Sequence, residues 1–310
     1  MSLVGKKGID IGDHNGNINL AAAKAAGYEF VMLKCGYGSD EKSQDDSRFE
    51  ENVKKAESLG MPWGAWLYSY ALNKTQALSE VEHVKRLLKG KKPTLPVVID
   101  MEDGDNYKTK RGAYTAEVLT TVCKTFVDGI RAAGYYPMIY TGYYELRDYI
   151  SASVVASCDI WLAEWSRSPD YVKDNLGMWQ YGGETNLLES PYITGISGKV
   201  DKNKCYKDYP TIIKKGGYNG WGDGTVTQAN SLKFYTLAKS GYKNSAAQVK
   251  TVQRLLNWLG YKDKNGKVLK VNGSFDASTD YAVREYQRKH DLTVDGIVGE
   301  KTWKLLTAGK

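Results

Sequence analysis

The sequence predicts an α/β protein: an irregular β/α barrel of TIM type with degenerate last helices, followed by a small three-helix C-terminal module. Strand patterns alternate with helical patterns about every 25 to 35 residues, which is typical of βα units and a parallel sheet. About eight such units in about 205 residues favour a closed barrel over an open sheet. A turn-rich stretch then separates the barrel from three short helical patterns.

Each expected strand is a short apolar run bounded by glycine, proline or polar residues. The eight runs are residues 8–12, 30–34, 63–70, 94–103, 137–141, 159–165, 178–181 and 199–201. Amphipathic patterns predict helices over residues 20–26, 48–59, 75–88 and 116–133. Residues 166–177 and 182–198 carry no long helical pattern, so we expect the last helices of the barrel to be missing or short.

We expect the barrel over residues 1–213, a linker over 214–240 and the small module over 241–310. The module holds a short repeat, because Val271-Asn-Gly with Thr279 matches Val294-Asp-Gly with Thr302. In each copy the pattern predicts a turn, then a buried apolar residue, then a helix that begins at the Thr. Only one acid is present in each copy, which favours a turn over a calcium site.

The composition is that of a globular protein, with 42% hydrophobic and 25% charged residues. No run of 18 apolar residues is present, so we expect no membrane insertion. Residues 1–8 lack an apolar core, so we expect no secretory signal peptide. The four cysteines are scattered, without C-x-x-C, and are expected to be buried free thiols rather than disulfides or a zinc site. We therefore expect no metal and no cofactor.

The net charge of +7 is unevenly distributed. Residues 241–310 hold 13 Lys and Arg against 7 Asp and Glu, so the rest of the chain is nearly neutral. A basic end module suits an anionic polymer, and charge alone does not choose between nucleic acid, membrane and bacterial wall.

Acidic residues follow the apolar run Val97-Val98-Ile99 at Asp100 and Glu102. Side chains alternate along a strand, so these two carboxyls are expected on one face. Paired carboxyls are costly for a fold and useful for acid–base chemistry, although an isolated D-x-E is more often a solvated acidic turn. Asp10 and Asp201 are expected at the carboxyl ends of two further strands, where barrels hold their active sites. The four acids together are therefore the candidate catalytic residues.

Tyrosines and tryptophans are abundant, with 23 Tyr and 8 Trp against 5 Phe. Such rings stack on sugars, but core packing explains each of them equally well. The candidate substrate-binding residues are Tyr68, Tyr140, Trp161 and Tyr181. His83 and His290 lie in helical patterns and are expected at the surface. Three scattered histidines without G-x-S-x-G do not support a Ser-His-Asp hydrolase.

Several motifs resemble those of a known family. Residues 8–210 resemble the glycoside hydrolase family 25 lysozymes, also called Chalaropsis-type muramidases. The matching motifs are Gly8-Ile-Asp-Ile with His14-Asn-Gly, Pro96-Val-Val-Ile-Asp-Met-Glu, Ile160-Trp-Leu-Ala-Glu-Trp, Trp179-Gln-Tyr and Gly198-Lys-Val-Asp-Lys-Asn. Residues 244–306 resemble a three-helix peptidoglycan-binding domain, through Val252-Gln-Arg-Leu, Gly260-Tyr, Tyr286-Gln and Val294-Asp-Gly-Ile-Val-Gly with Thr302-Trp.

The resemblance implies hydrolysis of the β-1,4 bond between N-acetylmuramic acid and N-acetylglucosamine in bacterial peptidoglycan. It makes Glu102 the general acid and Asp100 its partner, which acts either on the substrate's 2-acetamido group or on a water. Asp10 and Asp201 correspond to the family's remaining acids. The separation of two carboxyls often predicts stereochemistry, but substrate-assisted enzymes are exceptions, so retention or inversion stays open.

We expect a wall-degrading enzyme that the C-terminal module anchors to peptidoglycan, with no nucleic acid partner and no membrane insertion. Two alternatives remain: a wall carbohydrate-binding protein without catalysis, and a chitinase-like glycosidase that would leave the C-terminal module unexplained. The enzyme would act on the bacterial cell wall, either as a phage endolysin released from the cytoplasm or as a secreted protein whose leader this sequence lacks.

Overall fold

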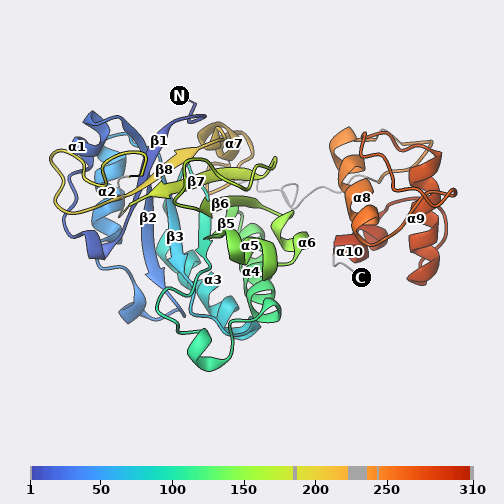
Figure 1. The fold of residues 1–310 in the computed structure, drawn as a ribbon, viewed down its shortest axis with the longest axis horizontal. Coiled ribbons are helices and arrows are strands. Elements are labelled where there is room, and N and C mark those ends of the chain that lie inside the picture. The colour runs from blue at the N-terminus through green and yellow to red at the C-terminus, as the bar shows by residue number, and fades with distance from the viewer. Residues whose placement is uncertain (1, 184–186, 223–235, 243, 308–310) are drawn as a thin grey trace. The chain divides into compact units, whose positions relative to one another are not determined.

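The structure is a computed structural model that describes residues 2–183, 187–222, 236–242 and 244–307. The chain divides into two compact units, residues 1–231 and residues 232–310. Figure 1 shows the helices and strands of both units.

The first unit is a closed barrel of eight strands that pair in chain order, and β8 also pairs with β1 (Figure 1). Seven neighbouring strands are parallel, whereas β8 is antiparallel to both β7 and β1. The strands are β1 (Lys7–Ile11), β2 (Tyr28–Tyr37), β3 (Trp63–Tyr68), β4 (Val97–Asp100), β5 (Pro137–Gly142), β6 (Asp159–Ala163), β7 (Leu176–Gly182) and β8 (Asp201–Cys205). The predicted barrel is therefore confirmed.

Helices follow the first five strands and lie on the outer side of the barrel (Figure 1). They are α1 (Leu20–Ala25), α2 (Phe49–Ser58), α3 (Lys74–Leu88), α4 (Ala116–Ala132), α5 (Tyr143–Asp148) and α6 (Ala152–Val155), with 3-10 turns η1 (Asp13–Asn15), η2 (Lys42–Gln44) and η3 (Thr109–Arg111). The four predicted helices are confirmed to within two residues. The short helices α5 and α6 were not predicted. Among the described residues, the connections on either side of β7 hold no helix, as expected.

The direction of β8 corrects the expectation of a wholly parallel sheet. Parallel neighbours need a crossover connection across the sheet, whereas antiparallel neighbours can be joined at one end of the barrel. Residues 183 and 187–200, the described part of the connection between β7 and β8, hold no helix, and β8 runs back from the end of the barrel at which β7 finishes. The eighth strand accordingly begins at Asp201, two residues beyond the predicted start, and runs to Cys205.

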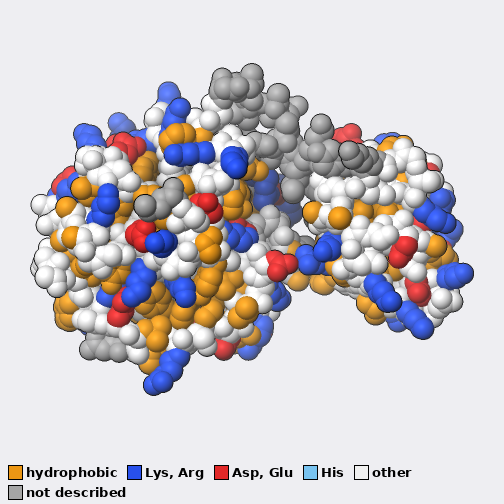
Figure 2. Space-filling view, turned by 90° about the horizontal axis from the view of Figure 1, so that it is seen from above, with side chains coloured by type: hydrophobic (Ala, Val, Ile, Leu, Met, Phe, Trp, Pro, Cys, Tyr) orange, Lys and Arg blue, Asp and Glu red, His pale blue; other side chains and the backbone are white. Residues whose placement is uncertain are grey.

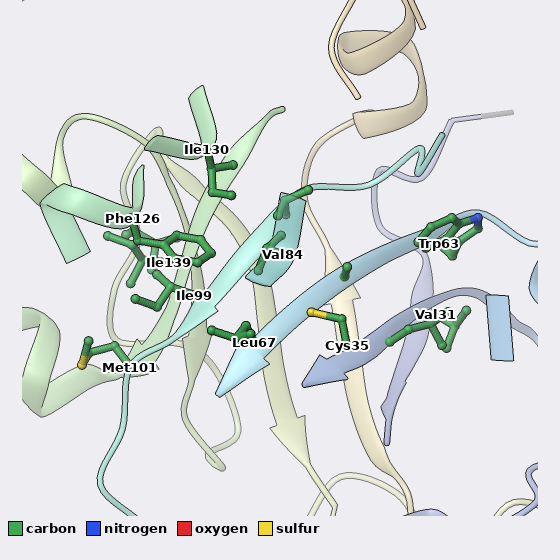
Figure 3. Packing of buried hydrophobic residues seen from close by; sticks show 14 of the residues in the cluster. Val31, Cys35, Trp63, Leu67, Val84, Ile99, Met101, Phe126, Ile130 and Ile139 are labelled. Atoms are coloured by element: carbon green, nitrogen blue, oxygen red, sulfur yellow. The ribbon is translucent and has the colours of Figure 1, made fainter. Parts of the chain in front are cut away.

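Strand side chains alternate between two hydrophobic layers. One set fills the barrel interior, and its buried members include Phe30, Met32, Trp66, Val98, Met138, Trp161 and Met178. The other set points outward against α3 and α4, where Leu67, Ile99 and Ile139 lie near Val84, Phe126 and Ile130 (Figure 3). This alternation fixes which strand residues face the barrel interior.

A further helix, α7 (Tyr209–Lys215), was not predicted and belongs to the barrel unit. Tyr209 is fully buried with the interior side chains, and its hydroxyl donates to Asp159 Oδ2 over 3.0 Å. Part of the predicted linker also packs on the barrel, because buried Asn219 accepts from Tyr136 N and donates to Leu95 O. Residues 223–235 of that linker lie outside the described residues, so its boundaries stay a prediction.

The second unit contains α8 (Ala246–Trp258), α9 (Ala277–Lys289) and α10 (Glu300–Thr307), which confirms the three predicted helices. Lys and Arg side chains of this unit are visible on the face shown in Figure 2. The core of the second unit is apolar and includes Leu237, which pairs with Val298 through a β-bridge. The remaining fully buried members are Val249, Val252, Leu256, Ala282, Val283, Tyr286, Trp303 and Leu306.

The sequence repeat of this unit corresponds to two buried glutamines. Gln253 Oε1 accepts from Gly273 N over 3.0 Å, and its Nε2 donates to Thr279 Oγ1 over 3.0 Å. In the second copy, Gln287 makes the equivalent bonds to Gly296 N over 2.9 Å and to the Thr302 hydroxyl over 3.3 Å. Each glutamine therefore joins a V-[ND]-G turn to a Thr in the first turn of the next helix, which confirms the turn interpretation. The helices themselves begin two residues earlier, at Ala277 and Glu300.

All four cysteines are free, and Cys35, Cys123 and Cys205 are buried while Cys158 is half-buried. This agrees with the expected unpaired thiols. Of the helices in the described residues, none is both long and apolar enough to cross a membrane.

Replacing Gln287 by Leu should destabilise the C-terminal unit by about 2 to 4 kcal/mol, because Gly296 N–H and Ile297 C=O lose their buried partner. Hydrogen–deuterium exchange of residues 277–306 across a urea series would measure the change. The control is Lys289→Leu on the exposed side of the same helix, for which we expect less than about 0.5 kcal/mol. Equal effects of the two substitutions would contradict the role of Gln287.

Candidate active site

The four predicted acids meet at one end of the barrel. Asp10 on β1 is the register partner of Asp201 on β8. Asp100, at the end of β4, is the register partner of Tyr68 on β3 and of Tyr140 on β5. Glu102 follows two residues after Asp100, with Met101 buried in the outer layer between them. The alternation predicted from the sequence therefore places Asp100 and Glu102 on the inner side.

Asp201 reaches this end for a reason other than the predicted one. It begins an antiparallel strand, and the start of that strand lies beside the carboxyl ends of the parallel strands. Space for its carboxylate depends on Gly183, where a Cβ atom would lie 1.6 Å from Asp201 Oδ1. A side chain at position 183 would therefore displace this acid.

Asp10 is buried, and two amides hold its carboxylate. Asn203 Nδ2 donates to Asp10 Oδ2 over 2.6 Å, and Gln180 Nε2 donates to the same oxygen over 3.1 Å. Burial raises the pKa of Asp10 to about 6, and these two hydrogen bonds oppose the increase because they favour the charged form. The geometry thus keeps one carboxyl near its titration point at weakly acidic pH.

Asp100 is deeper still, with 4% of its surface exposed. Its Oδ1 atom is buried and has no hydrogen-bond partner among the described residues. Burial, followed by the charge of Glu102, raises the pKa of Asp100 well above its ordinary value, and Lys108 opposes the increase. An unsatisfied buried acceptor is costly, so this oxygen is suited to a donor that arrives with a ligand.

Glu102 is half-buried and faces an open groove of about 400 Å³. Burial raises the pKa of its carboxyl, and the charges of Asp10 and Glu145 add to the increase. Glu102 therefore combines access to a ligand with a raised affinity for a proton, as a general acid requires. The other residues around the groove are Lys34, Tyr37, Tyr68, Tyr70, Gly104 and Asp105.

Tyrosine rings continue this groove away from Glu102. The Tyr70 ring lies 5.0 Å from that of Tyr68, 4.7 Å from Tyr107 and 5.8 Å from Tyr37 between centroids. A second hollow of about 310 Å³ shares Tyr37, Tyr70 and Asp105 with the first. The two hollows together form an extended path with aromatic walls, which suits a chain of pyranose rings.

The four aromatic residues chosen from the sequence are in different environments. Tyr68 lines the groove, and half-buried Tyr140 donates its hydroxyl to Gln180 Oε1 over 3.0 Å within the acid cluster. Trp161 is only 1% exposed in the barrel interior and donates to Asn203 Oδ1 over 2.7 Å. Tyr181 packs in the outer layer and hydrogen-bonds Glu189. In this structure Trp161 and Tyr181 are therefore not placed to stack on a sugar in the groove.

The expectation for His83 was wrong, because its side chain is fully buried. Its Nδ1 donates to Gly38 O over 3.1 Å, and its Nε2 lies 2.8 Å from Asp45 Oδ1. These contacts hold the loop after β2, which directly follows the groove residue Tyr37 at the end of that strand. His290 is half-buried and lies 3.2 Å from the Tyr261 hydroxyl.

Sequence reasoning missed three residues that complete the site: Lys34, Gln180 and Asn203. The available signal was the two-residue period of inward-facing positions. Phe30 and Met32 on β2 lead by that period to Lys34, and Asp201 on β8 leads to Asn203. A polar residue that continues this period near the end of a strand is therefore expected to point inward, towards the end of the barrel that holds the four acids.

Comparison with known proteins identifies the family of each unit. Residues 9–189 match the family described as glycosyl hydrolases family 25, and residues 245–306 match the putative peptidoglycan binding domain. The chain belongs to glycosyl hydrolase family 25. Asp10, Asp100, Glu102 and the residues that line the groove lie within the matched range 9–189, whereas Asp201 follows it.

Two relatives of this family member are named as lysozymes. The chain is 26% identical to lysozyme M1 of Streptomyces globisporus over 220 residues, covering 64% of this chain and 67% of the relative. It is also 26% identical to the autolytic lysozyme of Clostridium acetobutylicum over 296 residues, covering 96% of this chain and 77% of the relative.

A solved structure shares the fold. The modular autolysin LytC of Streptococcus pneumoniae, in complex with a synthetic peptidoglycan ligand, has a TM-score of 0.56 at 24% identity. The match covers 64% of this chain and 46% of LytC, so the chain spans about half the length of that protein.

Replacing Asp10 by Asn should remove a pH dependence of stability. The pKa of Asp10 is about 6 in the fold against 3.8 ordinarily, so its proton stabilises the fold below about pH 4 and this contribution is lost as pH rises to about 6. We expect wild type to lose about 3 kcal/mol relative to D10N across this window. Urea unfolding between pH 4 and 8 would measure it.

The control for this measurement is Asp128→Asn, which removes an exposed carboxyl from α4. Parallel stability curves for wild type and D10N would contradict the burial of a titrating carboxyl at position 10.

Proposed function

We propose that this protein hydrolyses the β-1,4 bond between N-acetylmuramic acid and N-acetylglucosamine in bacterial peptidoglycan, with Glu102 as general acid and Asp100 assisting. The observation that carries the proposal is the pairing of an accessible acid with a buried one. Glu102 faces the groove, and behind it Asp100 has a buried oxygen without a hydrogen-bond partner among the described residues. Family membership supports this reaction class.

Glu102 protonates the oxygen of the leaving sugar. Proton transfer requires an acid that remains protonated near the working pH, and burial together with neighbouring carboxylates raises the pKa of Glu102 in that direction. The groove provides the access that the more deeply buried Asp100 and Asp10 lack.

Asp100 acts from the inner side of the site. Its Oδ1 is available to accept a hydrogen bond from the N–H of the substrate's 2-acetamido group, or from a water. Either hydrogen bond favours the ionised form of Asp100, so that a proton shared by the two carboxyls resides on Glu102. Substrate binding therefore leaves Glu102 protonated and able to act as the general acid.

Asp10 and Asp201 add negative charge at the same end of the barrel. Positive charge develops at the anomeric carbon during glycoside hydrolysis, and fixed carboxylates stabilise it. Asn203 and Gln180 hold Asp10 in place for this role. The Tyr140 hydroxyl donates to Gln180, so its ring orientation is tied to the same network.

Peptidoglycan as the partner is supported by both units. The extended tyrosine-lined groove suits a glycan strand, and residues 245–306 match a putative peptidoglycan binding domain. The relatives named as lysozymes and the structure of LytC with a peptidoglycan ligand support the same substrate. We therefore place the action of this protein at the bacterial cell wall and propose neither nucleic acid nor membrane as partner; phage and secreted origins are both compatible with it.

Replacing Glu102 by Gln should lower the rate of clearing of purified bacterial walls by at least about a hundredfold, because the amide cannot donate the required proton. Turbidity of wall suspensions measures the loss. The control is Glu82→Gln on α3, whose side chain is 59% exposed, and it should clear walls at the wild-type rate.

The released fragments identify the bond. New reducing ends on muramic acid support the proposal, whereas reducing ends on glucosamine would overturn it in favour of another glycosidase. Equal clearing by E102Q and wild type would overturn the role of Glu102. Binding to walls without release of any fragment would indicate a carbohydrate-binding protein.

Removing residues 232–310 should weaken co-sedimentation with intact walls and leave hydrolysis of small soluble fragments unchanged, because the two units are separately compact. Pelleting assays with both proteins would measure the change in wall affinity. Unchanged pelleting would mean that the barrel alone holds the enzyme on the wall.

A further inference from the structure

One fully buried lysine lies against the acid pair. Lys108 immediately precedes η3 in the loop that follows β4, and its side chain is 0% exposed. Burying an ammonium group costs several kcal/mol unless polar groups surround it. The groups around Lys108 must therefore offset the free-energy cost of burying its charge.

Two backbone carbonyls accept hydrogen bonds from the Lys108 ammonium. One is Ser69 O, just after β3, and the other is Glu102 O, 3.1 Å away. Lys108 Nζ also lies 5.8 Å from the Tyr68 ring centroid and 6.0 Å from the Tyr70 ring centroid. The ammonium thus connects the backbone of the general acid to the loop after β3, which carries the groove residue Tyr70.

Hydrogen bonds to two acids fix the two loops that Lys108 connects. Asp103 accepts from Lys108 N over 2.7 Å and from Thr109 N over 2.8 Å, which folds the loop back on itself. Buried Glu80 on α3 accepts from the Ser69 hydroxyl over 2.8 Å and from Tyr70 N over 2.8 Å. The loops after β3 and β4 are therefore both fixed where Lys108 joins them.

The structure assigns Lys108 as a positioning residue: its ammonium fixes the backbone of Glu102 and supplies a fixed positive charge behind the Asp100–Glu102 pair. This inference rests on the proposed function and adds to it a residue that touches neither substrate nor reacting atoms. The charges of Glu80, Asp103 and Asp100 all favour the ammonium form, against burial, which lowers the pKa of Lys108.

The charge has a predictable effect on the acids. Lys108 lowers the pKa of both Asp100 and Glu102 and so limits the increase caused by burial. Without this charge, both carboxyls would hold their protons to higher pH. The charged groups that face the pair from the other elements are Asp10 on β1, Lys34 on β2, Asp105 in the loop after β4 and Glu145 on α5.

The test compares Lys108→Gln with Lys108→Arg in the full chain. Glutamine retains a donor for the two carbonyls without the charge, and arginine retains the charge. We expect kcat/KM on walls to fall about tenfold or more in K108Q, with both limbs of the pH profile moved by about one unit to higher pH. In K108R both limbs of the pH profile should stay at their wild-type pH, even if kcat/KM itself falls. Lys124→Gln, at an exposed position on α4, is the control for loss of a surface charge.

A second measurement does not depend on activity. Carbon-13 titration of the Asp and Glu carboxyls by NMR should show higher pKa values for Asp100 and Glu102 in K108Q than in wild type, with K108R unchanged. Unmoved limbs and unmoved carboxyl titrations in a folded K108Q would overturn the proposal. A wild-type protein that releases no fragments from walls would overturn the proposed function instead, while the NMR comparison would still decide the role of Lys108.

Discussion

The return of β8 between β7 and β1 is the constraint on which the site depends. This antiparallel strand closes the barrel and places Asp201 beside Asp10 in the sheet register. It also carries Asn203 inward, where one amide contacts both Asp10 and the indole of Trp161. A parallel eighth strand would begin at the opposite end of the barrel and would take these side chains away from the other acids.

The barrel mouth concentrates negative charge that the fold has to balance. Four carboxyls converge there, and two lysines face the central pair, Lys34 from β2 and Lys108 from behind the β4 loop. Amides from Gln180 and Asn203 supply further donors. The three acids therefore differ in their environment: the carboxylate of Asp10 accepts two hydrogen bonds, Asp100 retains an oxygen without a partner among the described residues, and Glu102 faces the groove.

Much of the barrel was predictable because strand periodicity and glycine-terminated helices are local signals. The carboxyl ends of Val97–Ile99 and of the first strand located Asp100, Glu102 and Asp10 without any tertiary information. The direction of β8 was not predictable in this way, because a strand pattern carries no direction and only its connection does. Trp161 and Tyr181 show the same limit, since their accessibility depends on which layer each strand face packs against.

The residues that tune the site were harder to find than those that form it. Lys108 lies in a turn with no periodicity, and only three-dimensional contacts show that its ammonium reaches the backbone of Glu102. His83 follows a helical pattern in which a buried polar position and an exposed one look alike. Its burial follows from the packing of α3 against the loop after β2.

The unpaired cysteines have a consequence for the chemical durability of the protein. Burial raises the pKa of all four thiols, which keeps them in the protonated form that reacts slowly with oxidants and disulfides. No covalent cross-link contributes to the stability of the barrel, since all four are free. A reductant therefore has no disulfide to break among these four cysteines.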